Sequence, residues 1–274
     1  MSLILKNLIP VIGSEVVDFN LATASDEQMA DVKAALDERG VLVFRNQQLT
    51  QDQHRALGRV FGAGKLHQHA LAGGETPDIL KLKTDENSKF VAGDGWHTDV
   101  TCDKNPIACS MLYMKQVPAS GGGDTLFANM NRAYETLSQP IKELIKNLSA
   151  FHDGAYPWKT VYGIPPEPGK TYPSCSHPVV IKHPDTGKPL LFVNSGFTTH
   201  IEGLPPAEGK YILDLLLNHV AATPLIQCRV QWGVNTLVMW DNVQTQHHAV
   251  WDYYPEARSA ERVSVVGTDL ESYF

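Results

Sequence analysis

Cysteine, basic residues and long apolar stretches are all scarce in this sequence of 274 residues. The four cysteines form no Cys-X-X-Cys pair, so a disulfide framework is not indicated, and their scattered spacing fits reduced thiols in a cytoplasmic protein. No apolar run approaches the roughly 18 residues that span a bilayer, and the stretch 1–6 is too short for the core of a signal peptide. We therefore expect a protein without a membrane partner.

Basic residues are fewer than acidic ones. Lys and Arg total 23 against 30 Asp and Glu, which gives a formal net charge of −7 and argues against nucleic acid as the main partner. The 43% of hydrophobic residues is typical of a globular protein, and the length predicts one domain over 1–274. A domain of this size buries about three quarters of its unfolded surface, so a metal site in it would serve function rather than stability.

Helices and strands alternate along the chain. Ser25-Asp-Glu-Gln28 and Thr50-Gln-Asp-Gln53 both match the capping box that opens a helix. Helices are predicted at 26–39, at about 51–61, at 131–148 and at 206–222. Short apolar segments divided by Gly, Pro and Asn turns predict strands near 41–44, 79–82, 108–114, 179–182, 190–193, 227–231, 236–240 and 263–266.

This order of elements predicts a mainly β fold, a sandwich or barrel of antiparallel strands with flanking helices packed outside. The stretch 156–176 is rich in Pro and Gly and contains no clear helix or strand pattern. Long loops in compact domains often carry function, so we expect an active-site loop or lid there.

Two segments contain candidate metal ligands. In Trp96-His97-Thr98-Asp99, an extended backbone would turn His97 and Asp99 to the same face, although a lone His-X-Asp is more often a surface His beside an acidic turn. Near the C-terminus, His247 and His248 follow an apolar strand. Two His and one carboxylate form the facial triad typical of non-haem iron(II). Because neighbouring strand residues face opposite sides, only one of the adjacent His can contribute.

Two arginines and a glycine-rich turn complete the candidate site. A guanidinium suits a carboxylate held by two hydrogen bonds, and Arg258 and Arg262 lie shortly after the His pair. Alternatively, both arginines are exposed charges on an edge strand. Gly121-Gly-Gly-Asp-Thr125 is either a plain hairpin turn or a turn that sets the Thr125 hydroxyl beside an arginine.

Together these segments resemble the taurine dioxygenase family of iron(II)/2-oxoglutarate-dependent dioxygenases, which also contains alkylsulfatases and phenoxyalkanoate dioxygenases. The motifs that carry the resemblance follow one another along nearly the whole chain: Phe61-Gly62, Leu66-His-Gln-His69, Trp96-His-Thr-Asp-Val100, Gly122-Gly-Asp-Thr125, His177-Pro-Val-Val180, Trp240-Asp-Asn242, Thr245-Gln-His247, Asp252-Tyr253, and Arg258 with Arg262. The resemblance implies a double-stranded β-helix, a jelly-roll or cupin-like barrel. It also implies Fe(II) as cofactor, with 2-oxoglutarate and O2 as cosubstrates.

The resemblance implies roles for the candidate metal and cosubstrate residues. It implies that His97, Asp99 and His247 bind iron, with His247 preferred to His248 by motif register. It implies that Thr125 and Arg258 hold the distal carboxylate of 2-oxoglutarate.

The resemblance also bears on the substrate. His69, in better register than His67, and Arg262 match family positions that contact the substrate. The implied reaction is hydroxylation of a small anionic substrate, an organic acid, sulfonate, sulfate ester or aryloxyalkanoate, with release of succinate and CO2. Gly93 stands where taurine-type enzymes have Asn, which argues against taurine itself, and the run from Gly93 to Asp99 is closer to the phenoxyalkanoate branch. A homodimer or homotetramer is implied as well.

Two other functions fit parts of the same pattern. A metal-dependent hydrolase would use the same His/Asp/His ligands with an activated water and would give Arg258 and Thr125 no role. A non-catalytic jelly-roll binding protein would need none of the three ligands. Because Asp99 is present, the pattern favours hydroxylation over halogenation, for which a small residue would replace the carboxylate.

Overall fold

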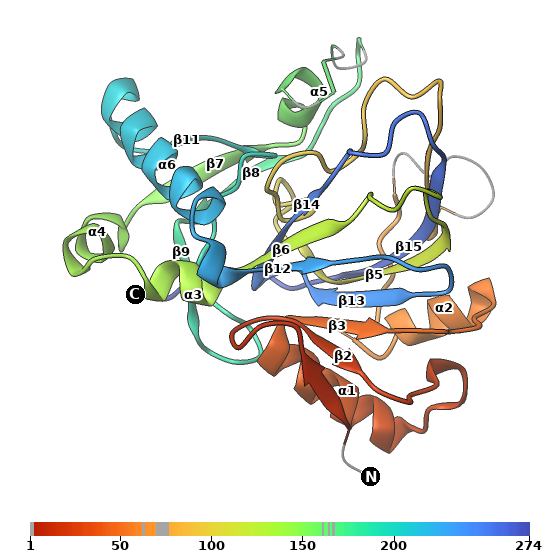
Figure 1. Cartoon of the computed structure of the whole chain (residues 1–274). Coiled ribbons are helices and arrows are strands. Elements are labelled where there is room, and N and C mark those ends of the chain that lie inside the picture. The colour runs from red at the N-terminus through yellow and green to blue at the C-terminus, as the bar shows by residue number, and fades with distance from the viewer. Residues whose placement is uncertain (1–2, 62–63, 70–76, 161, 164, 166–167) are drawn as a thin grey trace.

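The fold is built on two facing β-sheets. The computed structural model describes residues 3–61, 64–69, 77–160, 162–163, 165 and 168–274. The major sheet has the strand order β1 (Leu5–Asn7), β2 (Ser14–Val16), β3 (Val41–Phe44), β13 (Leu237–Asp241), β5 (Ile107–Gln116), β15 (Arg258–Val266) and β4 (Leu80–Thr84). The minor sheet has the order β12 (Gln227–Val230), β6 (Thr125–Asn129) and β14 (Thr245–Ala249), and it lies across one face of the major sheet (Figure 1).

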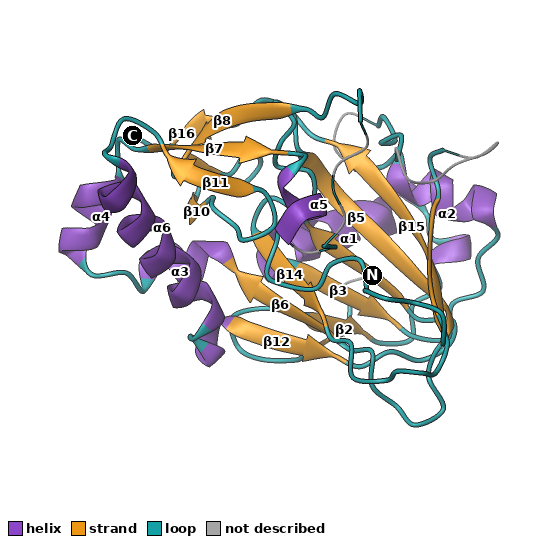
Figure 2. Ribbon diagram, turned by 90° about the horizontal axis from the view of Figure 1, so that it is seen from above, coloured by secondary structure: helices purple, strands orange, loops and turns teal. Residues whose placement is uncertain are grey.

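Two further three-stranded sheets and the helices surround this pair. One sheet has the order β11 (Thr198–Ile201), β7 (Ser149–Asp153), β8 (Ser174–Pro178), and the other β10 (Pro189–Leu191), β9 (Val180–Lys182), β16 (Glu271–Ser272). The helices are α1 (Asp26–Arg39), α2 (Gln51–Gly58), α3 (Met130–Glu135), α4 (Gln139–Ile145), α5 (Tyr156–Thr160) and α6 (Pro206–Ala221), with 3-10 turns η1 (Leu21–Thr23) and η2 (Pro224–Ile226). Figure 2 shows α3, α4 and α6 gathered at one side of the sheets.

The central strands are buried on both faces. In β3, Leu42 and Phe44 join a core shared with α1, whereas Val41 and Val43 join the core between the two sheets. A strand covered on both faces needs apolar residues at every position, which explains the continuous run Val41–Phe44. The same alternation continues along β13 and β5, so the space between the sheets is lined from both sides.

The helix predictions are confirmed with one correction. Both capping boxes form, and α6 occupies the expected stretch. The single helix expected over 131–148 is wrong, because the chain forms two short helices there, α3 and α4. Pro140 has no N–H to donate to the preceding turn, so α3 ends near Thr136 and Ser138 starts a new helix.

Every strand predicted from the sequence overlaps an observed strand, so the mainly β architecture with flanking helices is confirmed. The stretch 156–176 is not wholly irregular, since α5 occupies its start and β8 begins at its end, while 161, 164 and 166–167 lie outside the described residues. Gly62 of the Phe61-Gly62 motif also lies outside them. In the part of the chain that the structure describes, no helix is both long and apolar enough to cross a membrane.

Candidate metal centre and cosubstrate pocket

The His97–Asp99 segment is attached to the edge of the minor sheet. The backbone N–H of His97 donates to the carbonyl oxygen of His247 at 3.0 Å, and the N–H of His247 donates back to His97 at 2.8 Å. The hydroxyl of Thr98, on the opposite side of the segment, donates to the Thr245 carbonyl at 3.0 Å. His97 and His247 thus form an isolated antiparallel bridge beside β14, so backbone pairing brings the ligand segments together.

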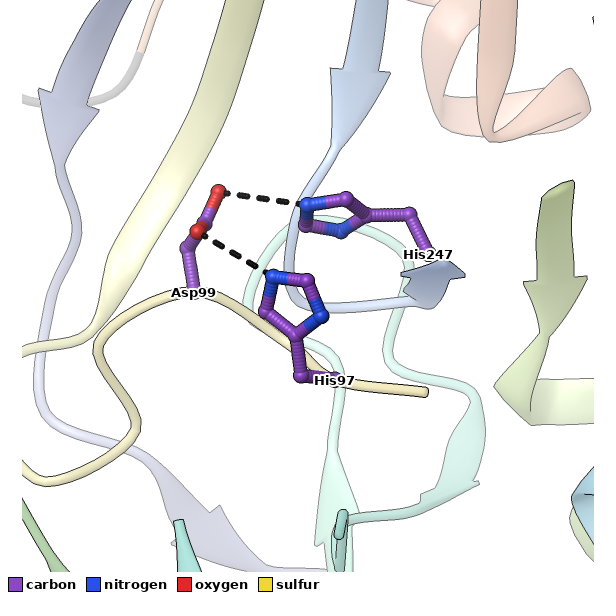
Figure 3. Close-up of side chains that lie close together, drawn as sticks. All are labelled: His97, Asp99 and His247. Atoms are coloured by element: carbon purple, nitrogen blue, oxygen red, sulfur yellow. Dashed lines mark ion pairs between the residues drawn. The ribbon is translucent and has the colours of Figure 1, made fainter. Parts of the chain in front are cut away.

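Three side chains converge between the two sheets (Figure 3). Nε2 of His97 lies 3.7 Å from Oδ1 of Asp99, and Nε2 of His247 lies 3.8 Å from Oδ2. All three ligand atoms lie within 4.8 Å of one another, and no other group of three His, Cys, Asp or Glu side chains is this close among the described residues. Nitrogen and oxygen donors at this separation can share one divalent ion, and one carboxylate with two imidazoles suits iron(II).

Both imidazoles are held in the form that binds metal. Nδ1 of His97 contacts the Gly95 carbonyl at 2.9 Å and must donate to it, which leaves the Nε2 lone pair free. Burial lowers the pKa of His97 and lowers that of His247 further, so both rings are neutral at neutral pH. A neutral imidazole is a ligand, whereas its protonated form is not.

Asp99 is held ionised and in a fixed orientation. Burial by itself raises the pKa of Asp99, but the charge of Arg262 beside it outweighs that effect, and the pKa falls below its usual value. Nη1 of Arg262 donates to both carboxylate oxygens, at 3.0 and 2.9 Å. The fully buried amide of Asn242 clamps the Asp99 backbone, accepting from its N–H and donating to its carbonyl, both at 3.1 Å.

The neighbouring His248 lies outside the cluster. Its side chain is 28% exposed and Nε2 lies 3.1 Å from Oδ1 of Asp94, because successive residues of β14 face opposite sides. The structure thus brings His97, Asp99 and His247 together and leaves His248 at the rim.

Thr125 and Arg258 are joined through an aromatic side chain. The indole N–H of Trp232 donates to the Thr125 hydroxyl at 3.0 Å, and the Arg258 guanidinium carbon lies 5.6 Å from the centroid of the Trp232 ring. Nε of Arg258 donates to the Gly123 carbonyl at 3.1 Å. The turn passes so close that a Cβ on Gly123 would lie 2.9 Å from Cδ of Arg258, so only glycine fits there.

Arg258 is a buried cation that has no acidic partner among the described residues. It is 7% exposed, and no carboxylate in the described residues lies within ion-pair distance of it. Burial lowers the pKa of Arg258, but a guanidinium stays protonated at neutral pH. A buried charge needs a counter-charge, and this one points to an anionic ligand.

These residues line one cavity of about 430 Å³. His69, Arg262 and the three candidate ligands all face it, as do Thr125 and Arg258. Nε2 of the buried His69 has no hydrogen-bond partner in the described part of the chain. Burial, with Arg262 and His67 contributing, lowers the pKa of His69 to about 3. An unpaired neutral nitrogen in a cavity wall is ready to donate to or accept from a bound molecule.

Part of the stretch 156–176 forms another wall of the cavity. Trp158, Tyr162 and Tyr172 line it, and the ring of Tyr162 packs on Phe90 with centroids 5.0 Å apart. Burial raises the pKa of Tyr162, so its hydroxyl stays protonated.

Sequence reasoning missed several of these residues. Trp232 has no sequence signal, since its neighbours are turn residues far from Thr125 in the chain. Asn242 stands in the Trp240-Asp-Asn242 motif, but the motif alone does not say that its amide clamps Asp99. The pairing of Arg262 with Asp99 was not expected either.

Comparison with known proteins finds similarity along most of the chain. The model of the family described as "Taurine catabolism dioxygenase TauD, TfdA family" matches residues 5–266. An alpha-ketoglutarate-dependent sulfonate dioxygenase of Saccharomyces cerevisiae is 31% identical over 94% of this chain, and the chain spans 66% of its length. An alkylsulfatase of Acinetobacter baylyi is 32% identical over 96% of this chain and 84% of its own. An alpha-ketoglutarate-dependent 2,4-dichlorophenoxyacetate dioxygenase of Cupriavidus pinatubonensis is 32% identical over 88% and 90%.

Solved structures share the fold. The crystal structure of a taurine dioxygenase from Burkholderia xenovorans is 30% identical, with a TM-score of 0.83 over 97% of this chain and 90% of that one. The protein AAD-2 is 24% identical, with a TM-score of 0.87 over 100% of both chains. The expected double-stranded β-helix is confirmed.

The clamp on Asp99 yields a prediction. Asn242→Ala should weaken binding of Co(II) by about tenfold or more, because the backbone that orients Asp99 loses its buried partner. Asn131→Ala is the matched control, since the Asn131 amide is also buried and donates to the Pro189 carbonyl at 2.9 Å, and neither residue lines the cavity. Each variant should lose about 1–3 kcal/mol in urea unfolding. Equal Co(II) affinity in the two variants would contradict the clamp.

Proposed function

The chain belongs to the TauD/TfdA family of dioxygenases and is an iron(II)- and 2-oxoglutarate-dependent dioxygenase; from this premise we propose that it hydroxylates a small anionic organic substrate, with release of succinate and CO2. The observation that carries the proposal is a buried His/Asp/His cluster sharing one cavity with an arginine that has no acidic partner among the described residues.

Iron is assigned to His97, Asp99 and His247. The donor set fits the ion, because two neutral imidazoles and one ionised carboxylate would hold iron(II) and leave positions for other ligands. Bound iron(II), together with the keto acid, supplies the activation of O2 that oxidises a substrate C–H bond. The protein's own residues orient these groups and keep water from the cavity.

The distal carboxylate of 2-oxoglutarate is assigned to Arg258 and Thr125. Nε of Arg258 is used by the Gly123 carbonyl, so its two terminal nitrogens remain to hold an anion. The Thr125 hydroxyl accepts from Trp232 and therefore has its own hydrogen to donate. The carboxylate would supply the negative charge that the buried guanidinium otherwise lacks.

The substrate anion is assigned to Arg262 and His69. Relatives are named for sulfonates, a sulfate ester and 2,4-dichlorophenoxyacetate, and each of these carries an anionic head on an apolar body. Leu80, Leu82 and Leu112 line the same cavity and suit such a body. A sulfonate, sulfate ester or aryloxyalkanoate is therefore the proposed substrate class.

Further parts of the proposal concern the whole molecule. We expect one catalytic domain over 1–274 in which the stretch 156–176 is an active-site loop or lid, a homodimer or homotetramer, and a cytoplasmic location. The hydrolase alternative is disfavoured because a water-activating metal needs no anion site at Arg258.

The first prediction tests the cosubstrate. Anaerobic addition of iron(II) and 2-oxoglutarate to metal-free protein should produce the visible charge-transfer band of a chelated keto acid. Arg258→Ala should abolish the band at cosubstrate concentrations that saturate the wild type, because the distal carboxylate loses its counter-charge. A wild-type protein with bound metal and no band would favour the hydrolase alternative.

The second prediction uses two glycines of one turn. Gly123→Ala should weaken 2-oxoglutarate binding by about tenfold or more, since its Cβ would lie 2.9 Å from Cδ of Arg258. Gly121→Ala is the control, because Gly121 also has a positive φ, +83° compared with +68° for Gly123, so alanine strains the backbone at both positions. A Cβ on Gly121 would meet nothing within 4 Å. The intensity of the charge-transfer band against 2-oxoglutarate concentration measures both, and similar affinities in the two variants would contradict the assignment of Arg258.

The third prediction concerns His69. Succinate release, screened over sulfonates, alkyl sulfates and aryloxyacetates, identifies an accepted substrate. With that substrate, His69→Ala should raise KM by about tenfold, because the anion loses one hydrogen bond, while the charge-transfer band without substrate stays at wild-type intensity. An unchanged KM would remove His69 from the substrate site.

A further inference from the structure

Arg262 contacts a metal ligand with only one of its three nitrogens. Nη1 lies 3.0 and 2.9 Å from the two oxygens of Asp99, so this one nitrogen donates to both oxygens of the same carboxylate. Nε of Arg262 is buried and has no hydrogen-bond partner among the residues that the structure describes. A guanidinium has five N–H donors, and three of them, on Nε and Nη2, make no bond to the described residues.

The unused donors belong to the cavity. Arg262 lies on β15 in the cavity wall, and its side chain is 13% exposed. The unpaired Nε2 of His69 belongs to the same wall. A donor fork and an unpaired imidazole nitrogen together form a place for an anion with several oxygens.

We propose that Arg262 bridges the two sites: through Nη1 it holds Asp99, and through Nε and Nη2 it holds the substrate anion, so that binding of the metal and binding of the anion strengthen each other. The inference rests on the proposed function, because it takes the His97/Asp99/His247 cluster as the metal site.

The sign of the coupling follows from the charges. With Arg262 on Asp99, the carboxylate is already neutralised and a divalent cation meets an additional positive charge at close range. An anion on the free side of the guanidinium cancels that charge without taking Nη1 from Asp99. The metal then binds more tightly, and by reciprocity the anion binds more tightly to the metal-loaded protein. A neutral analogue of the same shape leaves the charge in place and should give no coupling.

Two substitutions separate the charge from the contact. Arg262→Gln removes the charge and keeps an amide that can still donate to Asp99. Arg262→Lys keeps the charge but loses the fork, since an ammonium is a single point of attachment. Arg132→Gln is the control for net charge, because Arg132 is exposed on α3 and pairs with Glu135 away from the cavity.

The experiment measures Mn(II) binding to metal-free protein by electron paramagnetic resonance of the free ion. Arg262→Gln should bind Mn(II) at least about fivefold more tightly than wild type, whereas Arg262→Lys and Arg132→Gln should stay within about twofold. A weaker or unchanged affinity in Arg262→Gln would overturn the proposal, as would an equal gain in Arg132→Gln. Thermal unfolding followed by circular dichroism shows that each variant is folded.

The second arm adds an anion at saturating concentration. Phenoxyacetate, hexyl sulfate and ethanesulfonate are tested against the neutral 2-phenoxyethanol, after correction for Mn(II) bound by each compound in buffer. At least one anion should tighten Mn(II) binding by about fivefold or more in wild type and by less than twofold in Arg262→Lys, with no effect of the alcohol. Absence of any anion effect would overturn the bridge. A wild-type protein that binds no Mn(II) would instead refute the metal centre and with it the proposed function.

Discussion

The pairing of two backbone segments is the constraint on which the site depends. His97 and His247 exchange N–H···O bonds at 3.0 and 2.8 Å, so their side chains leave neighbouring positions at one end of the minor sheet. Asp99, two residues on, then points to the same side. The Asn242 amide, from the turn just after β13, holds the Asp99 backbone in place. The positions of the three ligand side chains are thus set by main-chain hydrogen bonds and by one buried amide.

The charges of the site follow from its position between two sheets. The minor sheet and its edge supply the ligands, while β15 of the major sheet supplies both arginines. In this buried space an ionised group must find a partner, and Asp99 finds Arg262. Arg258 donates to the Gly123 carbonyl and lies over the Trp232 ring, while the nearby Asp124 forms its ion pair with Arg229 instead. The site between the sheets therefore contains one buried ion pair, Asp99 with Arg262, and one buried cation, Arg258, that has no ion-pair partner among the described residues.

Local features of the sequence predicted most of the helices and strands and the metal-ligand motif. Contacts between segments that are distant in the sequence could not be predicted in this way. The capping boxes, the buried run Val41–Phe44 and the His-X-Asp spacing each express a local rule, and each element stands where the rule puts it. The division of 131–148 was missed because its apolar pattern is helical while Pro140 breaks the hydrogen bonds. Trp232 between Thr125 and Arg258, and Arg262 on Asp99, join residues more than 100 positions apart, and no periodicity records such contacts.

One strand also relates the two anion sites to each other. Arg258, Ala260 and Arg262 alternate along β15, so they face the same side, and Ala260 lies in the core between the sheets. Four residues of extended chain span about 13 Å, which is the backbone separation of the two arginines. If the two arginines lay on flexible loops, the distance between their bound anions could change. On one strand that is paired on both sides, that distance is fixed. Under the proposed assignments, the major sheet therefore fixes the distance between the cosubstrate carboxylate and the substrate anion, and the substrate carbon that would reach the metal depends on its distance from its own charged group.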